Sequence, residues 1–209
     1  MSPELSAVAL AKFVKDTKLD GVDVYFTDQK AFVEGIAEEW LIKFTRKLRD
    51  LLPLHIISHS PYATFFDDKE YKNGGYTKIH KEVGNLIDFY NVRFYGMGNS
   101  KYDQYYSLFY LSGPSGRVGT SLRELTLKGI PAEKIVLAKT TNRKENGFME
   151  FDLLGSYIEQ SMTILKWNGG VMIDDFSQDE NGQLIMDSAE KMVDPLFVKK
   201  IKLLSERKI

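Results

Sequence analysis

Apolar positions along the chain follow two spacings, one typical of helices and one typical of strands. In segments such as 5–14 they recur every three or four residues, which predicts amphipathic helices. Between these segments lie short runs rich in β-branched residues, such as 19–26, which predict strands buried on both faces. The expected strands are 19–26, 54–58, 87–95, 135–139 and 171–173, and the expected helices are 3–17, 30–51, 78–86, 102–111, 121–128, 153–165, 188–193 and 196–204. Strands that alternate with helices predict a parallel sheet of about five strands.

Two of the expected helices have clear boundary signals. Ser2 suits an N-cap, Pro3 suits the first helical position, and Glu4 places a negative charge in the first turn. Segment 30–51 predicts one long helix that ends before Pro53. Its apolar stripe consists of Phe32, Ile36, Trp40, Phe44 and Leu48.

Composition is that of a single globular domain covering residues 1–209. The chain has a net charge of −1, and its basic residues are scattered among acidic ones, so no nucleic-acid footprint is expected. No apolar stretch approaches the roughly 20 residues that span a bilayer, and no membrane association is expected. The chain has no cysteine and shows no secretory signal, which on sequence alone favours a cytoplasmic protein or a piece of a longer one.

Few residues suggest metal, cofactor or phosphate chemistry. The three histidines lack metal-ligand spacing, so structural roles are expected for His55, His59 and His80. Segment 113–116 is expected to form a turn, because the Lys and Ser or Thr of a phosphate-binding loop do not follow it. An acidic run could attract a hard cation, although a solvated loop is the favoured interpretation; the run consists of Asp174, Asp175, Asp179 and Glu180. We therefore expect no metal and no cofactor.

The first expected strand carries a recognisable pattern. Lys18-Leu19-Asp20-Gly21-Val22-Asp23-Val24-Tyr25-Phe26-Thr27-Asp28 resembles the signature strand of glycoside hydrolase family 18, the chitinases, whose pattern is D-G-x-D-x-D-x-E. Asp20, Gly21 and Asp23 match it. Tyr25 stands where the third Asp belongs, and Thr27 stands where the Glu belongs.

Four later segments resemble the same family in the same order. Segment 56–62 is similar to its fifth barrel strand, 87–95 to its sixth, 129–139 to the approach to its seventh, and 169–173 to its eighth. The resemblance covers residues from about 10 to 180. It implies a partial TIM-type (β/α) barrel equivalent to strands four to eight, with flanking helices, whereas a complete barrel has eight strands and about 250 residues.

A five-stranded open sheet has two edges with unpaired backbone groups. Helices, a second copy of the chain or a separate partner chain could cover these edges, and the chain could equally be a piece of a longer protein. The sequence leaves these alternatives open.

The resemblance also implies a chemistry that this chain has partly lost. In the family, the Glu protonates the leaving oxygen, and the preceding Asp orients the substrate acetamido group, which acts as the nucleophile. A hydroxyl at Thr27 cannot serve as a general acid near neutral pH, and Tyr25 carries no charge there. Of the remaining inward positions, Tyr95 matches the family's Tyr, and Asp174 replaces its Trp.

Two further positions complete the candidate substrate-binding set. Arg93 replaces a Gln of the family, and we expect it to pair with Asp23 where the sugar would lie. The alternative for Asp23 is a buried carboxylate that is hydrogen-bonded within the barrel. The candidate substrate-binding residues are therefore Asp23, Arg93, Tyr95 and Asp174, and no catalytic residue is assigned.

Three hypotheses follow. The leading one is a catalytically inactive chitinase-like protein that binds an amino-sugar glycan or a partner. The second is a glycoside hydrolase for N-acetylglucosamine-containing glycans with a shifted acid, Asp28 or Asp174. The third is an assembly role for the open sheet edges. Location stays undecided, because members of the family are often secreted.

Overall fold

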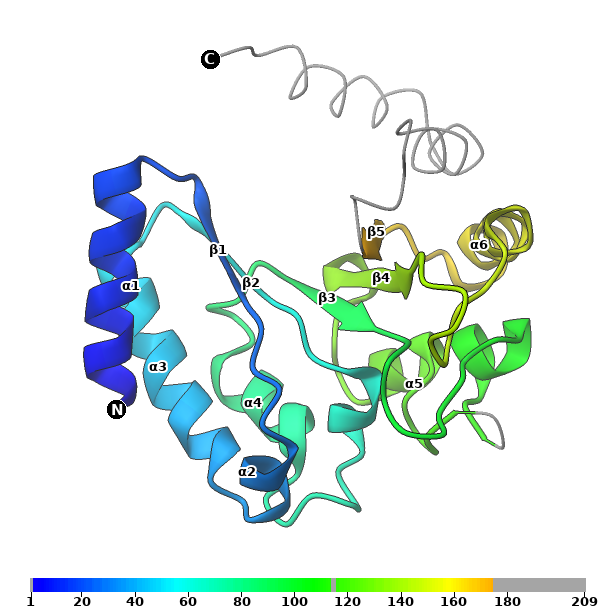
Figure 1. The fold of residues 1–209 in the computed structure, drawn as a ribbon, viewed down its shortest axis with the longest axis horizontal. Helices are drawn as coiled ribbons and strands as arrows, with labels where there is room; N and C mark the ends of the chain where they lie inside the picture. Colours follow the sequence, from blue (N-terminus) through cyan, green and yellow to red (C-terminus); the bar gives the residue numbers. More distant parts are fainter. Residues whose placement is uncertain (1, 114–115, 175–209) are drawn as a thin grey trace.

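The sheet of this protein is an open half-barrel. A computed structural model describes residues 2–113 and 116–174. Its five strands are all parallel and pair in chain order: β1 (Gly21–Val24), β2 (Ile56–His59), β3 (Phe89–Arg93), β4 (Ile135–Thr140) and β5 (Val171–Asp174). β1 and β5 are the two edge strands (Figure 1). This confirms the prediction of a partial TIM-type barrel with five parallel strands.

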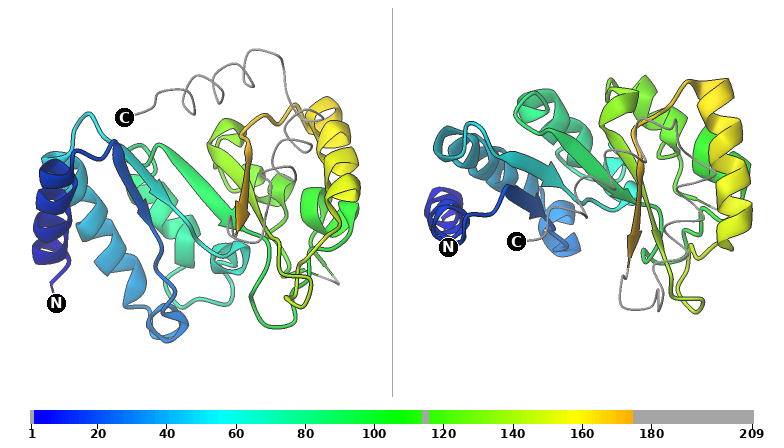
Figure 2. Two further views of the ribbon diagram at one scale, coloured as in Figure 1. Left: turned by 45° about the horizontal axis from the view of Figure 1, so that its top comes forward. Right: turned by 90° about the horizontal axis from the view of Figure 1, so that it is seen from above.

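Helices lie along one side of the curved sheet (Figure 2). They are α1 (Pro3–Thr17), α2 (Gln29–Val33), α3 (Ala37–Leu51), α4 (Gly75–Val83), α5 (Leu122–Leu127) and α6 (Phe151–Leu165), with short turns at Ala63–Phe66, Tyr106–Tyr110 and Ala132–Lys134. α1 begins as its sequence predicts, since the Ser2 side chain accepts a hydrogen bond from the Leu5 amide and Pro3 occupies the first turn. None of the helices in the described ranges is long and apolar enough to cross a membrane.

The prediction of one helix over 30–51 is wrong, because the chain breaks at Gly35. Gly35 has a φ of +73°, a left-handed conformation that glycine adopts without the strain of a side chain. α2 therefore ends before Gly35, and α3 starts anew at Ala37. Ile36 falls in this break and is 57% exposed, so it does not belong to the buried stripe.

Two other predicted helices differ from the structure. Segment 102–111 is not an α-helix: Tyr102 has a φ of +47°, and only Tyr106–Tyr110 forms a π-helical turn. α4 starts after Gly74, which has a φ of +87°, so the helix lies three residues earlier than the predicted 78–86. The helices expected at 188–193 and 196–204, and Pro114 and Ser115 of the expected turn, lie outside the described residues.

The core lies between the sheet and its helices. On β3, Tyr90 and Val92 are fully buried toward the helices, while Asn91 and Arg93 alternate to the opposite face and are only partly buried. A smaller cluster joins α1 to α3 through Ala7, Ala11 and Val14 on α1. This alternation turns a row of polar side chains toward the inner face of the half-barrel.

Candidate functional site

Polar and aromatic side chains from four parts of the half-barrel meet near the carboxyl ends of the strands. Strand pairing places Arg93 beside Ala138, and Thr140 beside Asp174, on the inner face. We call this group the mouth cluster; it consists of Tyr25 just after β1, Tyr62 after β2, Arg93 on β3, Tyr95 just after β3 and Asp174 at the end of β5. Ligand sites of parallel sheets lie at this end.

Arg93 is the centre of the mouth cluster. Its guanidinium carbon lies 4.0 Å from the centroid of the Tyr25 ring, within reach of a cation–π interaction. Nη1 of Arg93 donates to the Tyr95 hydroxyl at 2.7 Å and to Oδ2 of Asp174 at 2.9 Å, and the Tyr95 hydroxyl donates to the same carboxylate oxygen at 2.7 Å. The Arg93 side chain is only 11% exposed, and its Nε has no hydrogen-bond partner.

The expected pair between Arg93 and Asp23 is wrong, because Asp23 is already occupied by neutral donors. Ser58 donates to its carboxylate at 2.5 Å, Asn91 donates at 3.0 Å, and Ser60 also donates. The alternative of a hydrogen-bonded carboxylate therefore describes Asp23, although the residue is exposed rather than buried.

Burial affects the hydroxyl groups of two tyrosines of the mouth cluster, Tyr62 and Tyr95. Burial raises the pKa of Tyr95 above its ordinary value, and the hydrogen bond to Asp174 raises it further. Burial likewise raises the pKa of Tyr62, whose hydroxyl lies 2.8 Å from that of Tyr25. Tyr25 thus contacts both Tyr62, whose ring centroid lies 6.2 Å from its own, and Arg93.

The two residues at the end of the signature segment do not join the mouth cluster. Asp28 is the N-cap of α2, and its carboxylate accepts a hydrogen bond from the Ala31 amide at 3.0 Å. Thr27 is exposed. A capping carboxylate is held by the helix that it stabilises, which limits the use of Asp28 as a shifted acid.

The side chains of His59 and His80 have structural contacts, whereas Nδ1 of His55 is buried without a hydrogen-bond partner. His59 is fully buried between the hydroxyls of Thr45 and Tyr76, and burial lowers its pKa to about 3. His80 contacts the Tyr90 hydroxyl and the Gly129 carbonyl. Within the described ranges, no three His, Asp or Glu side chains are placed to hold a metal ion. Of the acidic run, only Asp174 is described, and it is paired with Arg93.

One buried cation lies outside the mouth cluster. Lys139 of β4 points toward the helix side and is 1% exposed. Its Nζ donates to the carbonyls of Phe94 and Tyr102, and burial lowers its pKa to about 7. It fixes the segment that follows β3, which carries Tyr95.

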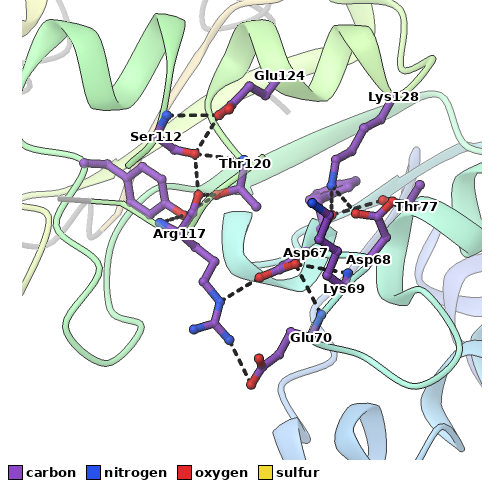
Figure 3. A network of polar contacts seen from close by, with 12 residues as sticks. Asp67, Asp68, Lys69, Glu70, Thr77, Ser112, Arg117, Thr120, Glu124 and Lys128 are labelled. Carbon is purple, nitrogen blue, oxygen red and sulfur yellow. Dashed lines mark hydrogen bonds and ion pairs between the residues drawn. The ribbon is translucent and has the colours of Figure 1, made fainter. Parts of the chain in front are cut away.

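A second polar network braces the loops beside the half-barrel (Figure 3). Arg117 bridges Asp67 at 2.9 Å and Glu70 at 2.8 Å, and Lys128 reaches Asp68 at 2.8 Å. Glu124 accepts from the backbone and hydroxyl of Ser112. Because each of these charged groups has an ion pair or hydrogen bonds within the network, we interpret it as structural support.

Sequence reasoning missed two residues at this end of the sheet. Tyr62 is the last residue of the segment that resembles the fifth strand, but the sequence does not mark it as a site residue. Glu145 follows β4 in a polar loop, and its carboxylate accepts from the Thr140 hydroxyl at 3.0 Å. No periodicity marks such a loop residue.

Several solved structures have a similar fold. A family 18 chitinase from Pseudoalteromonas aurantia is 28% identical, with a TM-score of 0.75; the match covers 90% of this chain and 67% of that one. The tamarind chitinase-like lectin is 20% identical, with a TM-score of 0.53; the match covers 84% of this chain and 57% of the lectin chain. A Cycas revoluta chitinase in complex with (GlcNAc)3 is 11% identical, with a TM-score of 0.60, and covers 85% of this chain and 69% of its own. No protein-family model and no curated protein matches the sequence.

The parallel strands and their flanking helices define a partial (β/α) barrel. More narrowly, the chain is chitinase-like, with the fold of glycoside hydrolase family 18, and it spans about two thirds of the bacterial chitinase that it resembles. The resemblance stated from the sequence is confirmed.

Proposed function

We propose that this protein is a catalytically inactive chitinase-like module that binds amino-sugar glycans at the mouth cluster. The observation that carries the proposal is the position of Arg93, stacked 4.0 Å over Tyr25 and paired with Asp174 at 2.9 Å. By the family resemblance, Tyr25 occupies the position of the acetamido-orienting carboxylate, and Thr27 that of the acid. A cation, a ring and a carboxylate that contact one another stand in place of free catalytic groups.

Binding without hydrolysis is compatible with what remains at this end of the sheet. Tyr25 is 48% exposed, although its hydroxyl already contacts that of Tyr62. Tyrosine combines an apolar surface with a polar tip, which suits the mixed surface of a sugar. A lectin and a chitinase crystallised with (GlcNAc)3 share the fold, and this supports an amino-sugar ligand for the present chain as a proposal.

The competing function is hydrolysis with a shifted acid. Asp28 caps α2, and Asp174 accepts from both Arg93 and Tyr95. Both carboxylates therefore already accept hydrogen bonds from groups of the fold, and neither is free to meet a leaving-group oxygen. These contacts favour the inactive alternative.

Calorimetric titration with chitin tetramers, both acetylated and partly deacetylated, tests binding, and release of a fluorogenic group from N-acetylglucosamine oligomers tests hydrolysis. We expect binding without hydrolysis. Hydrolysis that Asp28→Asn or Asp174→Asn abolishes would establish the shifted-acid enzyme instead. Absence of binding by every tetramer would reject the glycan role.

The outer face of α1 favours a second candidate, an assembly role. Leu5, Val8 and Phe13 are exposed on this helix, whereas the smaller Ala7 and Ala11 face the core. These three apolar side chains lie beside the exposed Lys12 and Asp16, and burial of the apolar ones against another chain would remove them from water. β1, the neighbouring edge strand, pairs only with β2 among the described strands.

We propose that a second copy or a partner chain covers this side in that role. Light scattering of the purified chain at increasing concentration tests self-association. Phe13→Asp should reduce any association, and Leu127→Asp, at an exposed leucine on α5, is the matched control. A monodisperse monomer that captures no partner would remove this candidate.

A further inference from the structure

Glu145 lies at the mouth cluster although it belongs to a loop. The loop after β4 turns back on itself, since the Glu145 amide donates to the Asn142 carbonyl at 3.0 Å and the Phe148 amide donates to the Glu145 carbonyl at 3.1 Å. Thr140, the hydroxyl donor to Oε2 of Glu145, pairs in register with Asp174. The Glu145 carboxylate is therefore held near the carboxyl ends of β4 and β5.

Gly96 provides the space for this carboxylate. Gly96 has a φ of +71°, and its amide donates to the Asn146 carbonyl at 2.8 Å. A Cβ at this position would lie 2.7 Å from Oε1 of Glu145 and 3.5 Å from a ring carbon of Tyr62. The carboxylate thus packs closely against the backbone of Gly96 beside the Tyr62 ring, and any larger residue at 96 would displace it.

Among the acidic groups of this region, Glu145 is the one with capacity to bind. Asp23 accepts from three neutral side chains, and Asp174 is paired with Arg93. Asp28 caps α2. Within the described part of the chain, Glu145 forms no ion pair. Oε2 of its carboxylate accepts a hydrogen bond from the Thr140 hydroxyl.

Charge defines the ligand that suits this arrangement. Asp23, Glu145 and Asp174 contribute three carboxylates, whereas among the described residues the ion pair given for this group is that of Arg93 with Asp174. An unpaired carboxylate forms strong hydrogen bonds with positively charged donors. An excess of negative charge also attracts cations and repels acidic sugars.

We propose that Glu145 is a ligand-binding residue that selects protonated amino sugars, of the glucosamine-oligomer type, over their N-acetylated counterparts. The inference rests on the proposed glycan-binding function and makes its ligand class more specific. Oε1 of Glu145 accepts the ammonium group, while the Tyr62 and Tyr25 side chains contact the adjacent sugar ring.

Titration of the full chain with a glucosamine tetramer and an N-acetylglucosamine tetramer, in mildly acidic buffer of low ionic strength, tests this selection. We expect the glucosamine tetramer to bind more tightly, with an affinity that falls as salt is added. Glu145→Gln should weaken its binding by about tenfold, because a charge-assisted hydrogen bond contributes roughly 1.5 kcal/mol or more. The same substitution should leave the N-acetylated tetramer nearly unaffected.

Two further variants complete the design. Gly96→Ala should act like Glu145→Gln, because the added Cβ displaces the carboxylate. Glu150→Gln, which removes an exposed partner of Arg143, should leave binding unchanged. Thermal unfolding of each variant distinguishes loss of binding from loss of fold.

The outcomes separate the two proposals. If neither tetramer binds the wild-type chain, the glycan-binding function itself fails. If both bind but the acetylated tetramer is preferred, or if Glu145→Gln leaves the glucosamine tetramer unaffected, the glycan-binding function stands and the role of Glu145 is wrong.

Discussion

At the scale of single residues, Arg93 connects the other side chains of the mouth cluster. A partly buried guanidinium requires compensation for the hydration that it loses. Here a ring face, a hydroxyl and a carboxylate supply that compensation together, from Tyr25, Tyr95 and Asp174. The four side chains are therefore coupled, and substitutions at their positions are expected to be non-additive.

Replacing Arg93 with Met should destabilise the protein by about 1 to 3 kcal/mol, because Asp174 and Tyr95 lose a charged partner in a partly buried site. The comparison is Arg143→Met, which breaks an ion pair with Glu150 whose arginine side chain is 72% exposed. That loss should be about 0.5 kcal/mol or less. Urea unfolding measures the loss of stability in both variants. Equal losses would mean that the contacts of Arg93 in the mouth cluster do not stabilise the fold.

His59 makes stability depend on pH. Its pKa is about 3 in the fold because of burial, against an ordinary value of 6.5. Between these values the unfolded chain binds a proton that the folded chain does not, so stability falls as pH drops from 6.5 toward 3. At two pH units below 6.5 the loss should be roughly 2 to 3 kcal/mol.

The check is the slope of unfolding free energy against pH in wild type and His59→Gln. The variant should show a shallower slope, whatever its absolute stability at neutral pH. His80 leaves a residual slope, because burial also lowers its pKa. An unchanged slope in the variant would exclude His59 as the source.

Among the elements, the break between α2 and α3 depends on one backbone conformation. Gly35 has a φ of +73°, and the Asn73 side chain donates to its carbonyl at 2.6 Å. A Cβ on residue 35 would lie 2.6 Å from that same amide nitrogen. The turn therefore needs glycine for two reasons, its left-handed φ and the close approach of Asn73.

Gly35→Ala should accordingly lower the free energy of unfolding more than an alanine substitution at a left-handed glycine that has no neighbouring atoms. Gly98 has a φ of +55°, and a Cβ added there would meet no atom within 4 Å, so Gly98→Ala isolates the backbone strain of about 1 kcal/mol. The extra destabilisation in Gly35→Ala measures the displaced Asn73. Equal losses in the two variants, by thermal or urea unfolding, would show that Asn73 moves at no cost.

Sequence patterns predicted the helices and strands better than the breaks within predicted helices. The five strands followed from runs of β-branched residues, since a buried parallel strand leaves little choice of side chain. The break at Gly35 was missed because the apolar spacing of 30–51 continues across it. Segment 102–111 has aromatic spacing that suits a helix, but Tyr102 adopts a left-handed φ fixed by the surrounding loops.

The same limit applies to the candidate site. Alternation along the strands predicted correctly that Arg93 and Asp23 share the inner face. It did not predict that Ser58, Ser60 and Asn91 would satisfy Asp23 first. Register across strands, which places Asp174 near Arg93, and loop geometry, which places Glu145, are tertiary properties.

At the scale of the whole molecule, the described strands form an open sheet rather than a closed barrel. The outer edge of β1 has no described strand beside it. The carbonyl of Asp20, just before β1, accepts from the Ile56 amide of β2, and the carbonyl of Val24 accepts from the amide of Ser60, just after β2. Because successive residues of a strand direct their amides to opposite sides, the Asp23 amide points toward the free edge.

Amide exchange measured residue by residue by NMR should therefore differ sharply within β1. In the isolated chain, the Asp23 amide should exchange much faster than the Val24 amide, which faces β2, because an amide exposed at an edge lacks a protecting acceptor. Val92 in the central strand β3 is the protected reference. Protection of Asp23 that matches Val92, and that is lost on dilution or in Phe13→Asp, would instead show that an associated chain covers this edge and would turn the assembly role into the leading function.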